Sequence, residues 1–303
     1  MASNHQRNDR QRAGRAGPKP VAPGPAHAAG TGHRRRLEET RAEWLWGWHT
    51  VVAALSNAAR PAPKRLLATP ERARALHAQV AGGLALEVAE AAAIGQILPP
   101  GAVHQGVGLR IPPLAPIDLD DLGADPRGVL IMLDQVTDPQ NVGTIFRSAA
   151  AFGARGVILQ DRNAPLLTGA LAKAAAGAID QIPHAREVNL SRALERLEGL
   201  GWRAVALDGE APDALADVLD GTPTVLVLGA EGDGVRRLVR EHCDAMANIP
   251  MPGGFESLNV AAAAAVALYQ ALAGGWPQKL PEAEQLSAAG DAAKPVTEAV
   301  VKR

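Results

Sequence analysis

A regular alternation of short apolar runs and helical segments is the feature that most constrains the fold of this chain. The first run begins at residue 129, and segments of helical periodicity separate it from the next ones. Short strands that are apolar throughout are typical of a parallel sheet covered by helices on both faces. The runs span residues 129–133, 156–159, 204–207, 225–228 and 246–249. Residues 260–272 are nearly all Ala, Val and Leu, which predicts a buried helix.

The chain before residue 112 repeats this alternation on a smaller scale, which predicts a small α/β unit. Thr69 followed by Pro70 is typical of a helix start, with Thr69 as the N-cap. The expected helices span residues 48–59, 70–80 and 90–98, and the expected strands span 64–68, 84–88 and 107–111. Residues 112–126 follow with four Pro and four Asp, a composition that predicts a linker.

The two ends of the chain differ from the predicted domains. Residues 1–36 hold eight Arg and Lys against the single acid Asp9, whereas the rest of the chain has a net charge of -8. This basic stretch is rich in Pro and Gly and has no apolar core, so it predicts a disordered arm rather than a secretory signal, with an organellar transit peptide as the alternative. The expected parts are a disordered basic arm (1–42), a small α/β domain (43–112), a linker (113–126), a large α/β domain (127–275) and a loosely ordered tail (276–303).

Cysteine usage and hydropathy exclude several classes of protein. Cys243 is the only cysteine, which excludes an intramolecular disulfide and a cysteine-only zinc site and predicts a half-buried residue at a helix end. No apolar stretch reaches the roughly 20 residues of a membrane span. We therefore expect a cytoplasmic protein with no membrane partner and no metal.

The loops that follow the apolar runs are the expected place for a ligand, because ligands of open parallel sheets bind at the carboxyl ends of the strands. In the first loop, Asn141 stands where a helix N-cap is expected, and a plain cap contributes roughly 1 kcal/mol. Arg147 follows six residues later among apolar neighbours. A guanidinium there is expected to be partly enclosed and to bind an anion such as a phosphate, with a solvated helix charge as the alternative.

The loop at 226–238 is rich in glycine, but its spacing excludes two common phosphate-binding motifs. The glycines form G-x-x-G-x-G rather than G-x-G-x-x-G, and no Lys-Ser or Lys-Thr pair follows. What remains is a turn whose backbone can approach a ligand closely, with Glu231 inside it, or a simple strand-to-helix turn.

The loop before the last predicted helix carries two polar residues close together. Ser257 and Asn259 precede that helix, and capping accounts for only one of them. The other polar side chain is therefore a candidate for binding a ligand.

Taken together and in this order, the three loops resemble a known family. NVGTIFR (141–147), LGAEGDG (228–234) and IPMPGGFESLNVA (249–261) are similar to the motifs of the SpoU-type (TrmH) branch of the knotted SPOUT RNA methyltransferases. GAVHQG (101–106) and DRNAPL (161–166) extend the resemblance, which runs from about residue 46 to 274, toward the enzymes that 2′-O-methylate a guanosine of bacterial 23S ribosomal RNA.

The resemblance implies a cofactor, a knotted fold and a set of site residues. Members of the family bind S-adenosylmethionine in a pocket formed by a C-terminal trefoil knot, act as homodimers and use an N-terminal α/β domain to bind RNA. The matching cofactor contacts are Gly229, Ile249 and Leu258, with Met251 as a weaker candidate. The residues that match the methyl-transfer site are Asn141, Arg147, Glu231, Ser257 and Asn259, with Arg147 contributed across the dimer interface.

Several alternatives remain open on the sequence. The substrate could be a transfer RNA, the chain could be a non-catalytic RNA-binding or ribosome-assembly module, and the failed glycine spacing makes a nicotinamide-dependent oxidoreductase a distant third. Arg147 could act as a base or stabilise the developing alkoxide, and a guanidinium is almost never neutral. Phe255 and Glu256 stand where relatives vary. Arg236, Arg237 and Arg240 are expected either at the pocket mouth or on a solvated helix face.

Overall fold

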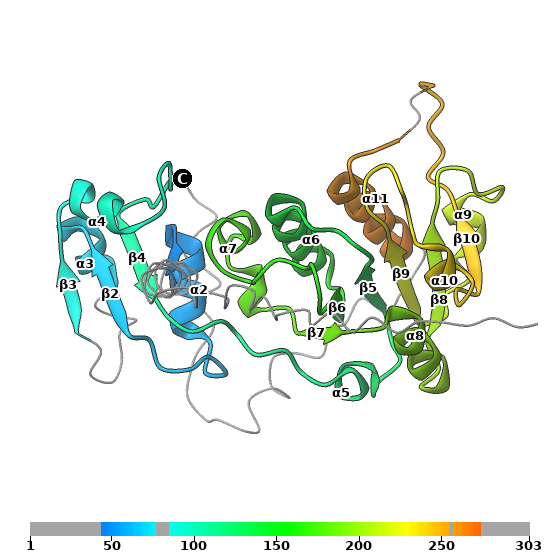
Figure 1. Cartoon of the computed structure of the whole chain (residues 1–303), viewed down its shortest axis with the longest axis horizontal. Coiled ribbons are helices and arrows are strands. Elements are labelled where there is room, and N and C mark those ends of the chain that lie inside the picture. The colour runs from blue at the N-terminus through cyan, green and yellow to red at the C-terminus, as the bar shows by residue number, and fades with distance from the viewer. Residues whose placement is uncertain (1–43, 77–84, 255–256, 274–303) are drawn as a thin grey trace, which may run out of the picture. The chain divides into compact units, whose positions relative to one another are not determined.

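The computed structural model describes residues 44–76, 85–254 and 257–273, which form a four-stranded and a six-stranded sheet with their helices (Figure 1). The predictions for the arm, for the tail and for Phe255 and Glu256 lie outside the described residues. None of the described helices combines the length and the apolar character that crossing a membrane requires.

The four-stranded sheet has the order β1-β4-β2-β3, in which only β2 and β3 are parallel. The strands and helices expected in this part of the chain are confirmed within a few residues. The helix predicted at 70–80 is described from Pro70 to Leu76. Strand β1 was not predicted, because three residues are too short to show an alternation. The elements are β1 (Trp44–Trp46), α2 (Trp48–Ser56), β2 (Arg65–Ala68), α3 (Pro70–Leu76), β3 (Leu86–Val88), α4 (Ala91–Ile97) and β4 (Val107–Arg110).

The larger sheet is parallel throughout and has the order β10-β8-β9-β5-β6-β7, as the alternation of apolar runs predicted. Its strands are β5 (Val129–Leu133), β6 (Gly156–Gln160), β7 (His184–Glu187), β8 (Arg203–Leu207), β9 (Thr224–Leu228) and β10 (Ala245–Ala247). The helices are α5 (Leu119–Gly123), α6 (Pro139–Phe152), α7 (Gly169–Ala175), η1 (Ala178–Asp180), α8 (Leu190–Gly199), α9 (Leu215–Val218), α10 (Arg237–Arg240) and α11 (Val260–Ala273).

Helices cover both faces of the parallel sheet, and alternate residues of each strand reach opposite faces. In β5, Ile131 packs with α6, α7 and α11, whereas Leu130 packs with α5 and α8 on the other face (Figure 1). At Gly143 of α6, a Cβ would lie 2.4 Å from the carbonyl oxygen of Leu171, so only glycine permits this approach of α6 to α7.

Two elements of this part of the chain were not predicted. Strand β7 is an edge strand of sequence HARE, whose polar residues show no apolar run. The predicted linker contains α5, which Asp118 caps, and whose Leu119 and Leu122 are buried. Just before it, the Ile117 N–H donates to the carbonyl oxygen of His184 in β7 (2.9 Å). The segment therefore packs against the sheet, and the domain boundaries around it stay a prediction.

The two central strands, β5 and β9, form a switch point of the sheet. Strand β6, which follows β5 in the chain, lies beside β5 on one side of the pair. Strand β10, which follows β9 in the chain, lies on the other side, beyond β8. The loops that follow β5 and β9 therefore separate at the carboxyl edge, where open α/β sheets bind their ligands.

Helix α11 is only partly buried, which corrects the sequence-based expectation. Ala264, Ala267 and Leu268 are buried against the sheet, but Val266 is 42% exposed and Tyr269 is 63% exposed. The all-apolar pattern therefore includes an exposed side as well as a core side. The trefoil knot stays a prediction.

Candidate active site

The first polar loop begins helix α6 with a cap other than the expected one. Asp138 is the N-cap, and its carboxylate accepts the N–H groups of Gln140 (3.1 Å) and Asn141 (3.3 Å), with Pro139 at the first helical position. Asn141 lies in the first turn, so the interpretation of Asn141 as the N-cap is wrong. Its side chain is released for another contact.

Asn141, Glu231 and Asn259 form a hydrogen-bonded cluster from three loops that are far apart in sequence. The Asn259 Nδ2 donates to Glu231 Oε1 (2.7 Å) and to Asn141 Oδ1 (3.0 Å), and the Asn141 Nδ2 donates to Glu231 Oε1 (3.2 Å). These loops follow β5, β9 and β10, so the cluster lies at the carboxyl edge of the parallel sheet.

Asn259 joins this cluster to the N-terminus of α11. Its Oδ1 accepts the N–H groups of Ala261 (3.0 Å) and Ala262 (3.3 Å), which is the geometry of an N-cap. The Val260 N–H also points to Glu231 Oε1 (3.5 Å). Glu231 Oε1 therefore lies at the N-terminus of α11, where the helix carries partial positive charge.

Two predicted methyl-transfer residues are outside the cluster. Ser257 is exposed two residues before the cap. Arg147 is exposed on α6, which corrects the expectation that its apolar neighbours enclose it. Ile145 and Phe146 are buried, and Arg147 follows on the adjoining, outward side of the helix. No hydrogen bond or ion pair joins Arg147 to another residue of the described chain.

The predicted cofactor residues lie on the loops after β9 and β10 and before α11. Gly229 directly follows β9, and a Cβ there would lie 1.9 Å from the carbonyl carbon of Gly234, so the turn closes too tightly for any side chain. Ile249 and Met251 follow β10 and are half-buried. Leu258 precedes the α11 cap with 39% of its surface exposed. Apolar side chains and a tight glycine turn are therefore close to the residues of the polar cluster in sequence and follow strands of the same sheet edge.

The three arginines near the second loop bind acidic side chains of this chain. Arg237 pairs with Glu241 (2.5 Å) and Arg240 pairs with Asp208 (3.0 Å). Arg236 pairs with Asp134 (2.8 Å), a fully buried carboxylate that sequence reasoning missed. The side chains of Arg236, Arg237 and Arg240 are 41%, 71% and 41% exposed, so the alternative of a solvated face is confirmed, with acidic partners that the sequence did not predict. The sequence feature that could have identified Asp134 is its position directly after an apolar run that predicts a buried strand.

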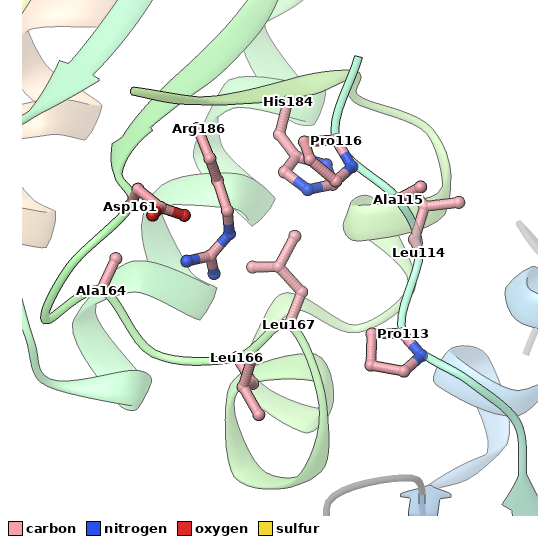
Figure 2. Close-up of a pocket in the computed structure, with 10 residues that line it drawn as sticks. All are labelled: Pro113, Leu114, Ala115, Pro116, Asp161, Ala164, Leu166, Leu167, His184 and Arg186. Atoms are coloured by element: carbon pink, nitrogen blue, oxygen red, sulfur yellow. The ribbon is translucent and has the colours of Figure 1, made fainter. Parts of the chain in front are cut away.

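A cavity of about 460 Å³ lies beside the edge strand β7, apart from the polar cluster. Figure 2 shows Asp161 beside Arg186 on one side of the lining and residues 113–116 on the other, with His184 at the top. Burial, with the charges of Arg186 and Arg60, lowers the pKa of His184 to about 4. His184 is therefore neutral at pH 7.

The described residues include one cysteine, Cys243, and no group of side chains suited to a metal ion. Cys243 is half-buried after α10, as expected, and burial raises the pKa of its thiol to about 12. Its thiol is therefore not a reactive nucleophile at neutral pH. Among residues 44–76, 85–254 and 257–273, no three His, Cys, Asp or Glu side chains gather as metal ligands.

A parallel sheet with a polar cluster at its switch point defines a ligand-binding α/β domain of the kind that enzymes use. Residues 128–269, which contain the six strands and the cluster, match the SpoU rRNA Methylase family. This segment is therefore similar to the SpoU methylases, in agreement with the resemblance.

Curated relatives and solved structures agree with this family. The chain is 45% identical over 172 residues to an uncharacterized tRNA/rRNA methyltransferase of Mycolicibacterium smegmatis and 43% identical over 171 residues to one of Mycobacterium leprae. The match to the Mycolicibacterium smegmatis protein covers 55% of this chain and 54% of that protein. The match to the Mycobacterium leprae protein covers 55% of this chain and 55% of that protein. The chain therefore spans about half the length of the curated relatives that it matches.

Two solved structures share the fold over most of the chain. The SpoU methyltransferase AviRb of Streptomyces viridochromogenes, in complex with the cofactor AdoMet, has a TM-score of 0.65 at 26% identity and covers 80% of this chain and 93% of its own. An AdoMet-bound rRNA methyltransferase of Sinorhizobium meliloti has a TM-score of 0.66 at 27% identity and covers 80% and 90%.

Proposed function

We propose that this chain is an S-adenosylmethionine-dependent RNA 2′-O-ribose methyltransferase that acts on a guanosine of 23S ribosomal RNA. The observation that supports this most is the Asn141–Glu231–Asn259 cluster, which joins three loops of a domain similar to the SpoU methylases at the carboxyl edge of its sheet. A non-catalytic RNA-binding module has no need of three polar side chains that are bonded to one another beside exposed apolar loops.

The loops fit the proposed cofactor in shape and polarity. The tight turn at Gly229 requires glycine, and Ile249, Met251 and Leu258 supply apolar surface suited to an adenosine and a methionine chain. AviRb, a structural relative, is solved with AdoMet. When bound, S-adenosylmethionine supplies an electrophilic methyl group.

The chain must then align a ribose hydroxyl and receive its proton. Alignment of reacting groups contributes about 7–11 kcal/mol in favourable cases, more than one proton transfer supplies. Glu231 Oε1 is occupied by amide donors, which leaves Oε2 to accept the hydroxyl in our proposal. The guanidinium of Arg147 stabilises the developing alkoxide, because a guanidinium is a donor of hydrogen bonds and almost never a base. Ser257 stands beside this site as a further hydroxyl donor.

A homodimer completes the proposed site. Arg147 is exposed and has no partner within the described part of this subunit, so a second copy can bring its Arg147 to the cluster. Helix α11 leaves Val266 and Tyr269 exposed, an apolar surface suited to an isologous contact between two copies. Light scattering of the purified chain is expected to give the mass of a dimer.

The RNA class is the finer part of the proposal. Ribosomal RNA is favoured because the resemblance continues through GAVHQG (101–106) and DRNAPL (161–166), and the small α/β unit is proposed to bind that RNA. The names of the relatives include both tRNA and rRNA, so a transfer-RNA ribose is the second candidate. We place the activity in the cytoplasm, where both RNAs occur.

Mapping of 2′-O-methyl groups in total RNA tests this function. RNA from a deletion strain is expected to lack one methyl group at a 23S guanosine, and the wild-type gene restores it whereas an Arg147→Ala gene does not. Loss of a methyl group from a transfer RNA instead would move the activity to the second candidate. An unchanged methylation map would contradict the proposal.

A further inference from the structure

Asp134, a buried residue outside the polar cluster, binds one end of the loop that carries Glu231 with its carboxylate and the other end with its backbone N–H. Asp134 directly follows β5 and is fully buried. Its Oδ2 accepts the backbone N–H of Arg236 (2.9 Å), and its Oδ1 accepts the Nε (2.8 Å) and Nη2 (2.8 Å) of the same residue. Its own N–H donates to the carbonyl oxygen of Leu228 (2.8 Å). Asp134 therefore touches the residue before and the residue after the loop 229–235.

Within the loop, the side chain of Glu231 is held by Asn141 and Asn259, but the backbone around it makes few bonds. Glu231, Gly232 and Asp233 are exposed, and the internal bond from the Gly234 N–H to the Ala230 carbonyl oxygen (3.0 Å) closes only its middle. Each exposed residue has backbone freedom that must be lost when the loop is ordered. The contacts that Asp134 makes at the two ends therefore add to those of Glu231 in fixing where the loop lies.

Because Asp134 is buried, its carboxylate depends on the charge of Arg236. Asp134 is fully buried, whereas the Arg236 side chain is 41% exposed. Removal of the arginine leaves a buried carboxylate without its counter-charge, and such a loss is more costly than removal of both groups. A neutral amide at position 134 retains the acceptor for the Arg236 N–H but loses the ion pair.

We propose that Asp134 and Arg236 are a positioning pair that holds the loop 229–235 in its binding geometry. The pair acts through Gly229, whose backbone is a proposed cofactor contact, and through Glu231, which is held against Asn141 and Asn259. The inference rests on the proposed function, since it assigns that loop to S-adenosylmethionine. It commits Arg236 to the loop, so Arg236 is not a contact for RNA.

The test compares Asp134→Asn, Arg236→Gln and the double variant with the wild-type chain. Calorimetric titration with S-adenosylmethionine gives the Kd, and amide hydrogen exchange of the ligand-free protein reports the loop directly. We expect each single variant to raise the Kd by about tenfold or more, as for the loss of a charged hydrogen bond. The double variant is expected to bind no more weakly than Arg236→Gln, because the two groups act as one pair.

Arg237→Gln is the matched control, because the adjacent Arg237 pairs with Glu241 at the exposed surface. It is expected to leave the Kd within twofold and the exchange of residues 229–236 unchanged, whereas the Asp134 and Arg236 variants accelerate that exchange and leave the central strands protected. An unchanged Kd with unchanged loop exchange would overturn the inference, and so would faster exchange throughout the sheet. A wild-type chain that does not bind S-adenosylmethionine would contradict the proposed function instead, while the exchange data still test the pair.

Discussion

At the scale of single residues, Glu231 is the centre of the site. One of its oxygens accepts two amide side chains, and those amides are bonded to each other. Asn259 also caps α11, whereas Asn141 has no capping role because Asp138 caps α6. Loss of Asn141 and loss of Asp138 therefore affect different properties of the protein.

Asn141→Ala is expected to lower kcat at least tenfold and to change the free energy of unfolding by less than about 0.5 kcal/mol. Asp138→Ala is expected to show the converse, with a loss of roughly 1 kcal/mol from the missing cap and a much smaller effect on kcat. Methyl-transfer kinetics and urea unfolding of both variants measure these effects. Wild-type kcat in Asn141→Ala would remove Asn141 from the site.

Arg147→Ala is expected to reduce turnover at least about 100-fold, the effect of removing one donor to a developing oxyanion. The Kd for S-adenosylmethionine is expected to change by no more than a few fold, because the side chain is exposed and makes no hydrogen bond or ion pair with the described residues of its own subunit. Single-turnover kinetics and titration calorimetry separate the two quantities. An equal loss of cofactor binding and activity would indicate a structural role for Arg147.

His184 makes stability depend on pH. Its pKa is about 4 in the folded protein and about 6.5 when unfolded, so in this window only the unfolded state binds the proton. Between pH 7.5 and 4.5 the wild-type chain is expected to lose roughly 2–3 kcal/mol more unfolding free energy than His184→Gln. Urea unfolding across this range measures the difference, and parallel curves for the two proteins would exclude His184 as the cause.

At the scale of elements, buried strands were predictable from sequence and short or polar ones were not. Strands β5 and β9 are continuous apolar runs, so their type and position followed from composition alone. The polar edge strand β7 and the helix α5 in a Pro-rich segment are stabilised by tertiary packing, which local propensity does not report. The grouping of Asn141 with Glu231 and Asn259 came from the family resemblance, because nothing in the spacing brings these residues together.

The segment after α2 is joined to η1 by a buried ion pair. Arg60 Nε lies 2.5 Å and Nη2 lies 3.0 Å from the Asp180 carboxylate, to which Asn57 also donates (3.0 Å). The side chains of the pair are 1% and 2% exposed. Arg60→Ala leaves a buried charge and is expected to lower the unfolding free energy by about 3–5 kcal/mol.

Arg65→Ala is the control for this pair, because Arg65 pairs with Glu87 at positions that are 40% and 46% exposed. It is expected to cost less than about 1 kcal/mol. Urea unfolding of both variants provides the comparison. Equal losses would show that burial does not distinguish the two ion pairs.

At the scale of the whole molecule, the site depends on the order of the strands. The chain leaves β5 toward one side of the sheet and leaves β9 toward the other, so their loops part at the centre. The third loop, which precedes α11, brings Asn259 to the same place. Asn141 and Asn259, which are 118 positions apart in the sequence, are thus brought together by the tertiary fold.

A crystal structure of the full chain with S-adenosylmethionine tests the central claim most directly. The account predicts the ligand against the backbone of Gly229 and the side chains of Ile249 and Leu258, with its methyl group directed toward the Asn141–Glu231–Asn259 cluster. Density for the ligand at the cavity beside β7, or a crystal in which saturating ligand binds nowhere, would contradict it.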